Sequence, residues 1–144
     1  MAYSTDVDVQ ALFPDLQDYD NLSFSDDHAR TQADIQRKLR ISWFPMYLQS
    51  VNSTSSTSEM DNSKLTDAQF KNASVYHVLS YYILPKLSDF VEGDKFTSAM
   101  EFYRTRFEEE FDAILADGVE YDSDGDSTIT NKEKSVKTSL YLRR

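Results

Sequence analysis

Residues 94–118 read DKFTSAMEFYRTRFEEEFDAILADG, with apolar side chains recurring at steps of three and four residues. This spacing lines one face of an α-helix, while arginines and acidic residues fall on the remaining surface. Asp94 can cap the start, and Gly118 stands where a left-handed residue usually ends a helix. We therefore predict one long core helix whose stripe is Phe96, Met100, Tyr103, Phe107, Phe111, Ile114 and Leu115.

The composition indicates one all-α domain. A chain of 144 residues with 40% hydrophobic and 13% aromatic residues can build one core. Only three glycines and three prolines leave little turn chemistry for a many-stranded sheet. The absence of cysteine excludes disulfides and thiolate sites. We see no signal peptide and no apolar run long enough for a membrane, so we expect synthesis in a cytoplasm and no membrane partner.

Two further helices are indicated upstream of residue 49. Thr5 followed by Asp8 is a capping pattern for a short helix that Pro14 stops. Ser25 can cap the second helix, and Pro45 should end or kink it near Phe44. Its apolar stripe is Ile35, Leu39, Trp43 and Met46.

The third predicted helix is apolar on almost every side. Thr66 and Gln69 form a capping box at its start, and Pro85 should end it. Such a helix needs cover all round, so we expect it to be the most buried, packed between the second helix and residues 94–118 or shared with a neighbouring subunit. His77 in this helix and His28 in the second are expected to be satisfied core or surface histidines.

The predicted fold is a bundle of about four helices over residues 1–118, followed by an acidic loop and a basic C-terminal arm over residues 119–144. Residues 49–64 read QSVNSTSSTSEMDNSK, which is low in complexity and nearly free of apolar side chains. Such a segment cannot bury enough surface to order itself, so we expect a mobile loop within the bundle.

Charge is distributed unevenly along the chain. The formal net charge is −10, yet residues 131–144 hold five basic residues and one acid. The preceding 130 residues therefore carry 10 basic and 24 acidic residues, a formal charge of −14. Such a surface repels nucleic acid and favours a basic protein partner, a cation, or simple solubility.

The acidic loop (residues 122–133) reads DSDGDSTITNKE and has the ligand spacing of an EF-hand calcium loop. In that interpretation Asp122, Asp124, Asp126, the Thr128 carbonyl and a bidentate Glu133 surround the ion. Ser127 occupies the sixth position, where glycine is expected, and no second loop is present to pair with this one. The alternative is a solvated acidic turn without a metal.

Motifs for catalysis are missing from the sequence. It contains no glycine-rich phosphate loop, nucleophile elbow, HExxH or zinc spacing, and two isolated histidines suggest no Ser-His-Asp set. We expect no enzyme.

Several segments together resemble the small head–tail connector (adaptor) proteins of tailed bacteriophages. The resemblance covers nearly the whole chain as a pattern of elements, with the acidic loop and the ending LRR as its most telling part. Residues 49–64 have no counterpart in that pattern. The segments are MAYSTDVDVQALFP (1–14), ISWFPMY (41–47), LTDAQFKNASVYHVLSYYILPKL (65–87), EFYRTRFEEEFDAILADG (101–118) and VEYDSDGDSTITNKEKSVKTSLYLRR (119–144).

The resemblance implies a structural virion protein of the phage neck, assembled in the host cytoplasm. It implies a ring of identical subunits, commonly twelvefold, beneath the portal protein, with tail or neck proteins bound on other surfaces. An acidic lumen would let DNA pass without specific binding. The alternatives are a calcium-binding protein with a single loop and a non-enzymatic cytoplasmic interaction module.

The C-terminal arm (residues 135–144) is the predicted partner-binding segment. Leu140, Tyr141 and Leu142 are apolar anchors, and Arg143 and Arg144 can pair with carboxylates of another subunit. The resemblance implies that the arm grips the portal. The alternative is a frayed terminus that only aids solubility.

Overall fold

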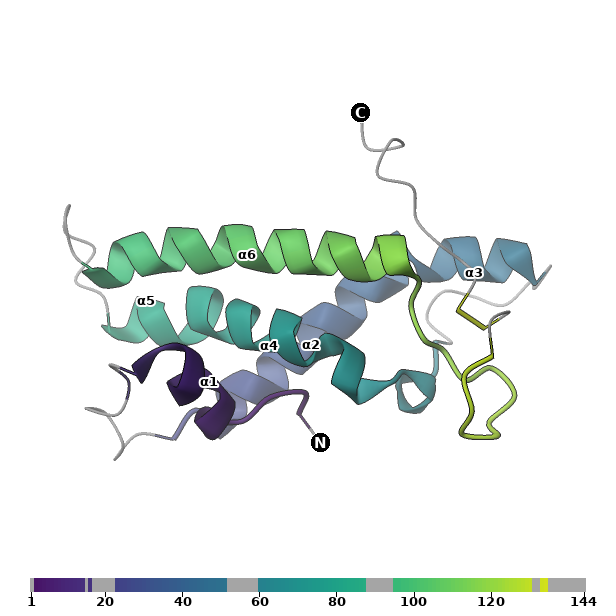
Figure 1. Cartoon of the computed structure of the whole chain (residues 1–144), viewed down its shortest axis with the longest axis horizontal. Coiled ribbons are helices and arrows are strands. Elements are labelled where there is room, and N and C mark those ends of the chain that lie inside the picture. The colour runs from purple at the N-terminus through teal and green to yellow at the C-terminus, as the bar shows by residue number, and fades with distance from the viewer. Residues whose placement is uncertain are drawn as a thin grey trace. The chain divides into compact units, whose positions relative to one another are not determined.

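The computed structural model describes residues 2–14, 16, 23–51, 60–87, 95–130 and 133–134 (Figure 1). The predicted all-α fold is confirmed. In these residues the only β-pairing is an isolated bridge between Leu65 and Tyr121. None of the helices in them is long and apolar enough to cross a membrane. The α-helices are α1 (Asp6–Leu12), α2 (Ser25–Ser42), α3 (Phe44–Ser50), α4 (Lys71–Val78), α5 (Leu84–Leu87) and α6 (Lys95–Asp117).

Internal contacts divide the chain into two compact units. Unit 1 comprises Met1–Ala33 and Lys71–Glu110, and unit 2 comprises Asp34–Phe70 and Phe111–Arg144. Helices α2 and α6 therefore each supply residues to both units. The predicted division into residues 1–118 and 119–144 does not coincide with these units.

The core of unit 1 forms where α4, a π-helical turn (Leu79–Ile83) and α5 run beside the first part of α6 (Figure 1). Helix α1 adds Val9 to this core, and Phe13 contacts the rings of Phe96 and Tyr103 at 6.2 Å between centroids. The buried apolar members of the core are Val9, Leu16, Phe24, Val75, Val78, Leu79, Ile83, Leu84, Phe96, Met100 and Tyr103.

Helix α4 lies between α2 and α6 within unit 1, as predicted for the most buried helix. His77 of α4 is within hydrogen-bond distance of Thr31 in α2, at 3.1 Å between Nδ1 and Oγ1. On its other side the His77 ring meets Phe107 of α6 edge-on at 4.7 Å. His77 is buried and hydrogen-bonded, which confirms the expectation of a satisfied core histidine.

The prediction that Pro85 ends the third helix is wrong. The helix widens into the π-helical turn at Leu79–Ile83 and then continues as α5 to Leu87. Proline lacks an N–H and its ring crowds the carbonyl four residues earlier, here that of Tyr81. A wider turn over those residues accommodates the ring, so the chain passes Pro85 without breaking.

Pro45 does separate two helices in unit 2, as predicted, but the chain becomes helical again at once. Helix α2 ends at Ser42 and α3 starts at Phe44, with Pro45 in its first turn, where no N–H is needed. Helix α3 places Phe44 and Tyr47 against Trp43. Trp43, Ile35 and Leu39 of the predicted stripe are fully buried, while Met46 is half-buried.

Three further predictions can be compared with the structure. Gln69 does not form a capping box with Thr66. Its side-chain amide instead donates to the Gly118 carbonyl at 2.9 Å and accepts from the Glu120 N–H at 3.0 Å. The ends of the predicted mobile loop 49–64 are structured: Gln49 and Ser50 finish α3, Met60 is buried, and Asn62–Lys64 form a 3₁₀ turn. Residues 52–59 lie outside the described residues. Every residue of the apolar stripe predicted for residues 94–118 is buried. Asp94, the predicted cap of that helix, lies outside the described residues.

Candidate functional site

The start of the acidic loop is anchored to residues 61–65, which belong to the same unit 2. Tyr121 forms the bridge with Leu65, and the Asp122 N–H donates to the Lys64 carbonyl at 2.8 Å. The Tyr121 hydroxyl accepts from the Asp61 N–H at 3.2 Å, and its ring packs edge-on against Tyr47 at 5.0 Å. Backbone pairing and the buried ring of Tyr121 therefore fix the position of Asp122, the first acidic residue of the loop.

The end of the loop closes back over the end of α6. Gly118 has φ +105°, and a Cβ at this residue would lie 2.2 Å from the Lys134 carbonyl oxygen. The Lys134 ammonium pairs with Asp117 at 2.9 Å and with Glu120 at 3.4 Å. Gly118 is thus required both for the left-handed turn that ends α6 and for the close passage of residue 134.

Inside the loop three carboxylates gather. Oxygens of Asp122, Asp124 and Asp126 lie within 4.8 Å of one another. The Asp122 carboxylate accepts from the N–H groups of Gly125 at 3.0 Å and Ser127 at 2.7 Å, which curls the backbone around it. Ser127 has φ +65°, so serine adopts here the left-handed conformation for which glycine is expected at this position.

The three carboxylates repel one another. The Asp126 N–H donates to Asp124 and lowers its pKa, but the side chains of Asp122 and Asp126 outweigh that bond. The pKa of Asp124 therefore ends above its ordinary value. A hard cation among the carboxylate oxygens would relieve this repulsion, and such oxygens are the ligands that calcium prefers.

Glu133 is engaged elsewhere in the loop. Its carboxylate accepts from the N–H and hydroxyl of Ser123 at 3.0 and 3.1 Å, and from those of Thr130 at 2.8 and 3.1 Å. These bonds, with that from the Thr130 N–H the strongest, lower the pKa of Glu133 to about 2. To bind an ion with both oxygens, Glu133 would have to exchange these four hydrogen bonds.

Thr130 and Glu133 form a capping box that sequence reasoning missed. The Glu133 N–H donates to the Thr130 hydroxyl at 3.2 Å, and the Lys134 N–H donates to the Thr130 carbonyl at 3.2 Å. The signal was present, since Thr-Asn-Lys-Glu matches the Thr-x-x-Glu pattern. These bonds reproduce the hydrogen-bond pattern of a helix N-cap, with Thr130 in the capping position.

The remaining predicted site residues are less defined. Thr128 is exposed, and its N–H donates to Asp126 at 2.8 Å. Binding of a cation by the Thr128 carbonyl stays a prediction. The predicted partner-binding residues of the C-terminal arm lie outside the described residues; they are Leu140, Tyr141, Leu142, Arg143 and Arg144.

Comparison of the chain with protein-family models, curated proteins and solved structures finds no match.

Unit 1 contains a second polar cluster that the sequence did not suggest. His28 is 3% exposed; its Nε2 lies 3.0 Å from Asp6 Oδ1 and its Nδ1 lies 2.8 Å from Ser4 Oγ. Ser4 Oγ lies 2.7 Å from Ser74 Oγ. Both ring nitrogens thus have partners, as expected of a satisfied histidine, and the chain of bonds ties the N-terminal segment to α2 and α4.

Proposed function

We propose that this protein is a structural head–tail adaptor of a tailed bacteriophage, a subunit that joins the capsid to the tail. The resemblance of its segments to that family supports the proposal, and the all-α fold is compatible with it. The structural observation that supports it most is the anchored acidic loop, which is fixed at Tyr121 and capped at Thr130 and Glu133 just ahead of the C-terminal arm.

The charge distribution suits this role. An acidic body of formal charge −14 would keep DNA from adhering as it passes through the neck. The basic arm, with its apolar anchors, is the segment that attaches one subunit to another protein of the assembly. The portal is the partner that the resemblance implies for the assembled ring.

Electron microscopy of purified chain added to tailless phage heads tests the proposal. We expect added density at the portal vertex and recovery of tail attachment. Heads that show neither at saturating protein would contradict the adaptor role. DNA-filled heads that bind the chain away from the portal vertex would contradict it as well.

Calcium binding by the acidic loop is the second candidate function. It is supported by the carboxylates of Asp122, Asp124 and Asp126 within 4.8 Å of one another and by the left-handed Ser127. A single loop with serine at the sixth position suits weak binding, because ligand number and rigidity set calcium affinity. An ion there would reduce the repulsion among these three carboxylates and so stabilise the loop that precedes the C-terminal arm in the sequence.

Titration calorimetry tests calcium binding directly. Calcium should release or absorb heat on binding and raise the melting temperature, because a ligand that binds only the folded state stabilises it. Asp124→Ala should remove both effects, whereas Glu101→Ala, an exposed acid on α6, should keep them. No heat at millimolar calcium would exclude this candidate.

A further inference from the structure

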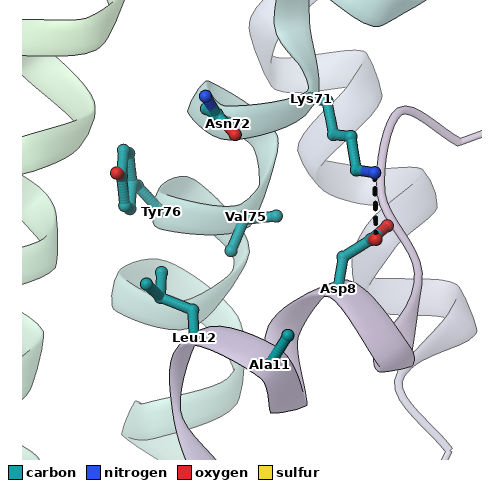
Figure 2. Close-up of a pocket in the computed structure, with 7 residues that line it drawn as sticks. All are labelled: Asp8, Ala11, Leu12, Lys71, Asn72, Val75 and Tyr76. Atoms are coloured by element: carbon teal, nitrogen blue, oxygen red, sulfur yellow. Dashed lines mark ion pairs between the residues drawn. The ribbon is translucent and has the colours of Figure 1, made fainter.

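A groove opens between α1 and α4 in unit 1 (Figure 2). Its volume is about 310 Å³, and its apolar lining comes from Ala11 and Leu12 of α1 and Val75 and Tyr76 of α4. The ion pair between Lys71 and Asp8, at 3.2 Å, joins the two helices across one end of the groove (Figure 2).

One lining residue of the α1/α4 groove, Tyr76, also contacts aromatic side chains of α6. Tyr76 stacks on Tyr103 at 6.1 Å between centroids, and Phe102 meets Tyr103 edge-on at 5.1 Å. Phe102 is 58% exposed and Leu12 is 40% exposed, both high for such side chains. Arg106 donates to the Tyr76 hydroxyl at 3.4 Å and to Glu109 at 3.3 Å, which gives this surface a charged border. An apolar centre with a charged border is typical of a protein-binding surface.

We propose that the α1/α4 groove binds the C-terminal arm of a second copy of this chain. The inference rests on the proposed function, which requires identical subunits to assemble, and it gives the arm a second copy of the chain as its partner in place of the portal. Charge complementarity supports the choice of occupant, because the arm (residues 135–144) carries three basic residues and no acid, while residues 1–134 carry 12 basic and 25 acidic residues, a formal charge of −13. The arm of one copy is therefore attracted to the body of another.

The arm also has side chains that suit the groove. In an extended backbone Leu140 and Leu142 project to the same side, about 7 Å apart, so both can enter one apolar groove. Arg143 and Arg144 follow directly and could share or replace the ion pair that Asp8 of the groove makes with Lys71. This is the recognition of a short extended segment through apolar anchors and flanking charge.

Contact between an arm and a groove joins two different surfaces of the same chain. Such a heterologous contact repeats from copy to copy, and it gives a ring if the rotation closes or a filament if it does not. Head-to-tail assembly of this chain alone is the consequence.

Fluorescence polarisation with a labelled peptide of residues 131–144 and the full chain tests the groove. Leu12→Glu should weaken peptide binding at least tenfold, because it places a charge among the apolar anchors. Val7→Glu is the matched control, since Val7 is a 73% exposed apolar residue on the same helix outside the groove, and it should bind like the wild type. A peptide of the same composition in scrambled order controls for simple charge attraction, and circular dichroism checks that both variants fold.

Sedimentation of the full chain measures the assembly itself. Oligomers should grow with protein concentration, and both Leu12→Glu and deletion of residues 135–144 should abolish them. Equal peptide affinity for the wild type and Leu12→Glu, equal affinity for the scrambled peptide, or a chain that stays monomeric at all concentrations would overturn the inference. These assays need no phage component: heads that accept a chain without peptide affinity would refute only the groove, and the reverse result would refute only the adaptor role.

Discussion

Gly118 is the residue on which the geometry of the acidic loop depends most. We expect Gly118→Ala to destabilise the fold by more than about 2 kcal/mol, because an L-residue is strained at positive φ and the new methyl would meet the Lys134 carbonyl. Urea denaturation followed by circular dichroism measures the change in free energy of unfolding.

Gly125 provides the matched control for this substitution. It also has a positive φ, +74°, but a Cβ there would have no neighbour within 4 Å. Gly125→Ala should therefore cost only the backbone strain, about 1 kcal/mol. Equal losses for the two variants would show that the close approach of residue 134 to Gly118 contributes nothing.

Glu133 makes the stability of the fold depend on pH. Its pKa falls from an ordinary 4.5 to about 2 in the folded chain, so the folded state binds fewer protons than the unfolded state between these values. Its contribution is complete above pH 4.5 and is lost as the pH falls towards 2. Glu133→Gln should therefore be less stable than the wild type at pH 7 and should differ from it much less at pH 2.5.

Denaturation at the two pH values measures this difference. Glu109→Gln is a suitable control, because Glu109 is an exposed surface acid whose carboxylate pairs with Arg106 at 3.3 Å. A gap between wild type and Glu133→Gln that stays constant from pH 7 to pH 2.5 would show that the four hydrogen bonds to the carboxylate contribute no pH dependence.

Helix α6 contains two phenylalanines that separate burial from propensity. Phe107 is 2% exposed and meets His77, whereas Phe102 is 58% exposed. Phe107→Ala should cost about 3–5 kcal/mol through lost transfer energy and an unfilled cavity. Phe102→Ala should change stability by less than about 0.5 kcal/mol. Thermal melting of the two variants checks the contrast, and similar shifts would mean that the assigned buried face of α6 is wrong.

The success of the sequence in predicting α6 has a simple physical basis. Its apolar residues repeat with the helical period over about five turns, and every predicted stripe residue is buried. Local sequence patterns gave a wrong prediction where a side chain bonds to residues far away in the sequence. Gln69 matched a capping box, yet its amide bonds Gly118 and Glu120, about fifty residues away in sequence, which no local pattern reveals.

The acidic loop shows the same limit for the site. The spacing of Asp122, Asp124 and Asp126 predicted that their carboxylates would gather, and they do. The letters Thr-x-x-Glu at its end fit both a calcium loop and a helix cap, and the structure has the cap. Sequence spacing brings residues into reach, whereas competing hydrogen-bond donors decide which partner each carboxylate takes.

The whole molecule should unfold as one cooperative system although its contacts form two units. Helices α2 and α6 each supply residues to both units, so neither unit can lose these helices without disrupting the other. Trp43, the only tryptophan, is fully buried in unit 2 and reports on that unit by fluorescence, while circular dichroism reports on all helices. We expect the two urea transitions to coincide, and we expect Phe107→Ala in unit 1 to move the Trp43 transition by the same amount as the helical one. A Trp43 transition that stays in place while the helical signal shifts would show that the units unfold independently, and the continuous helices would then have to fray at the boundary between them.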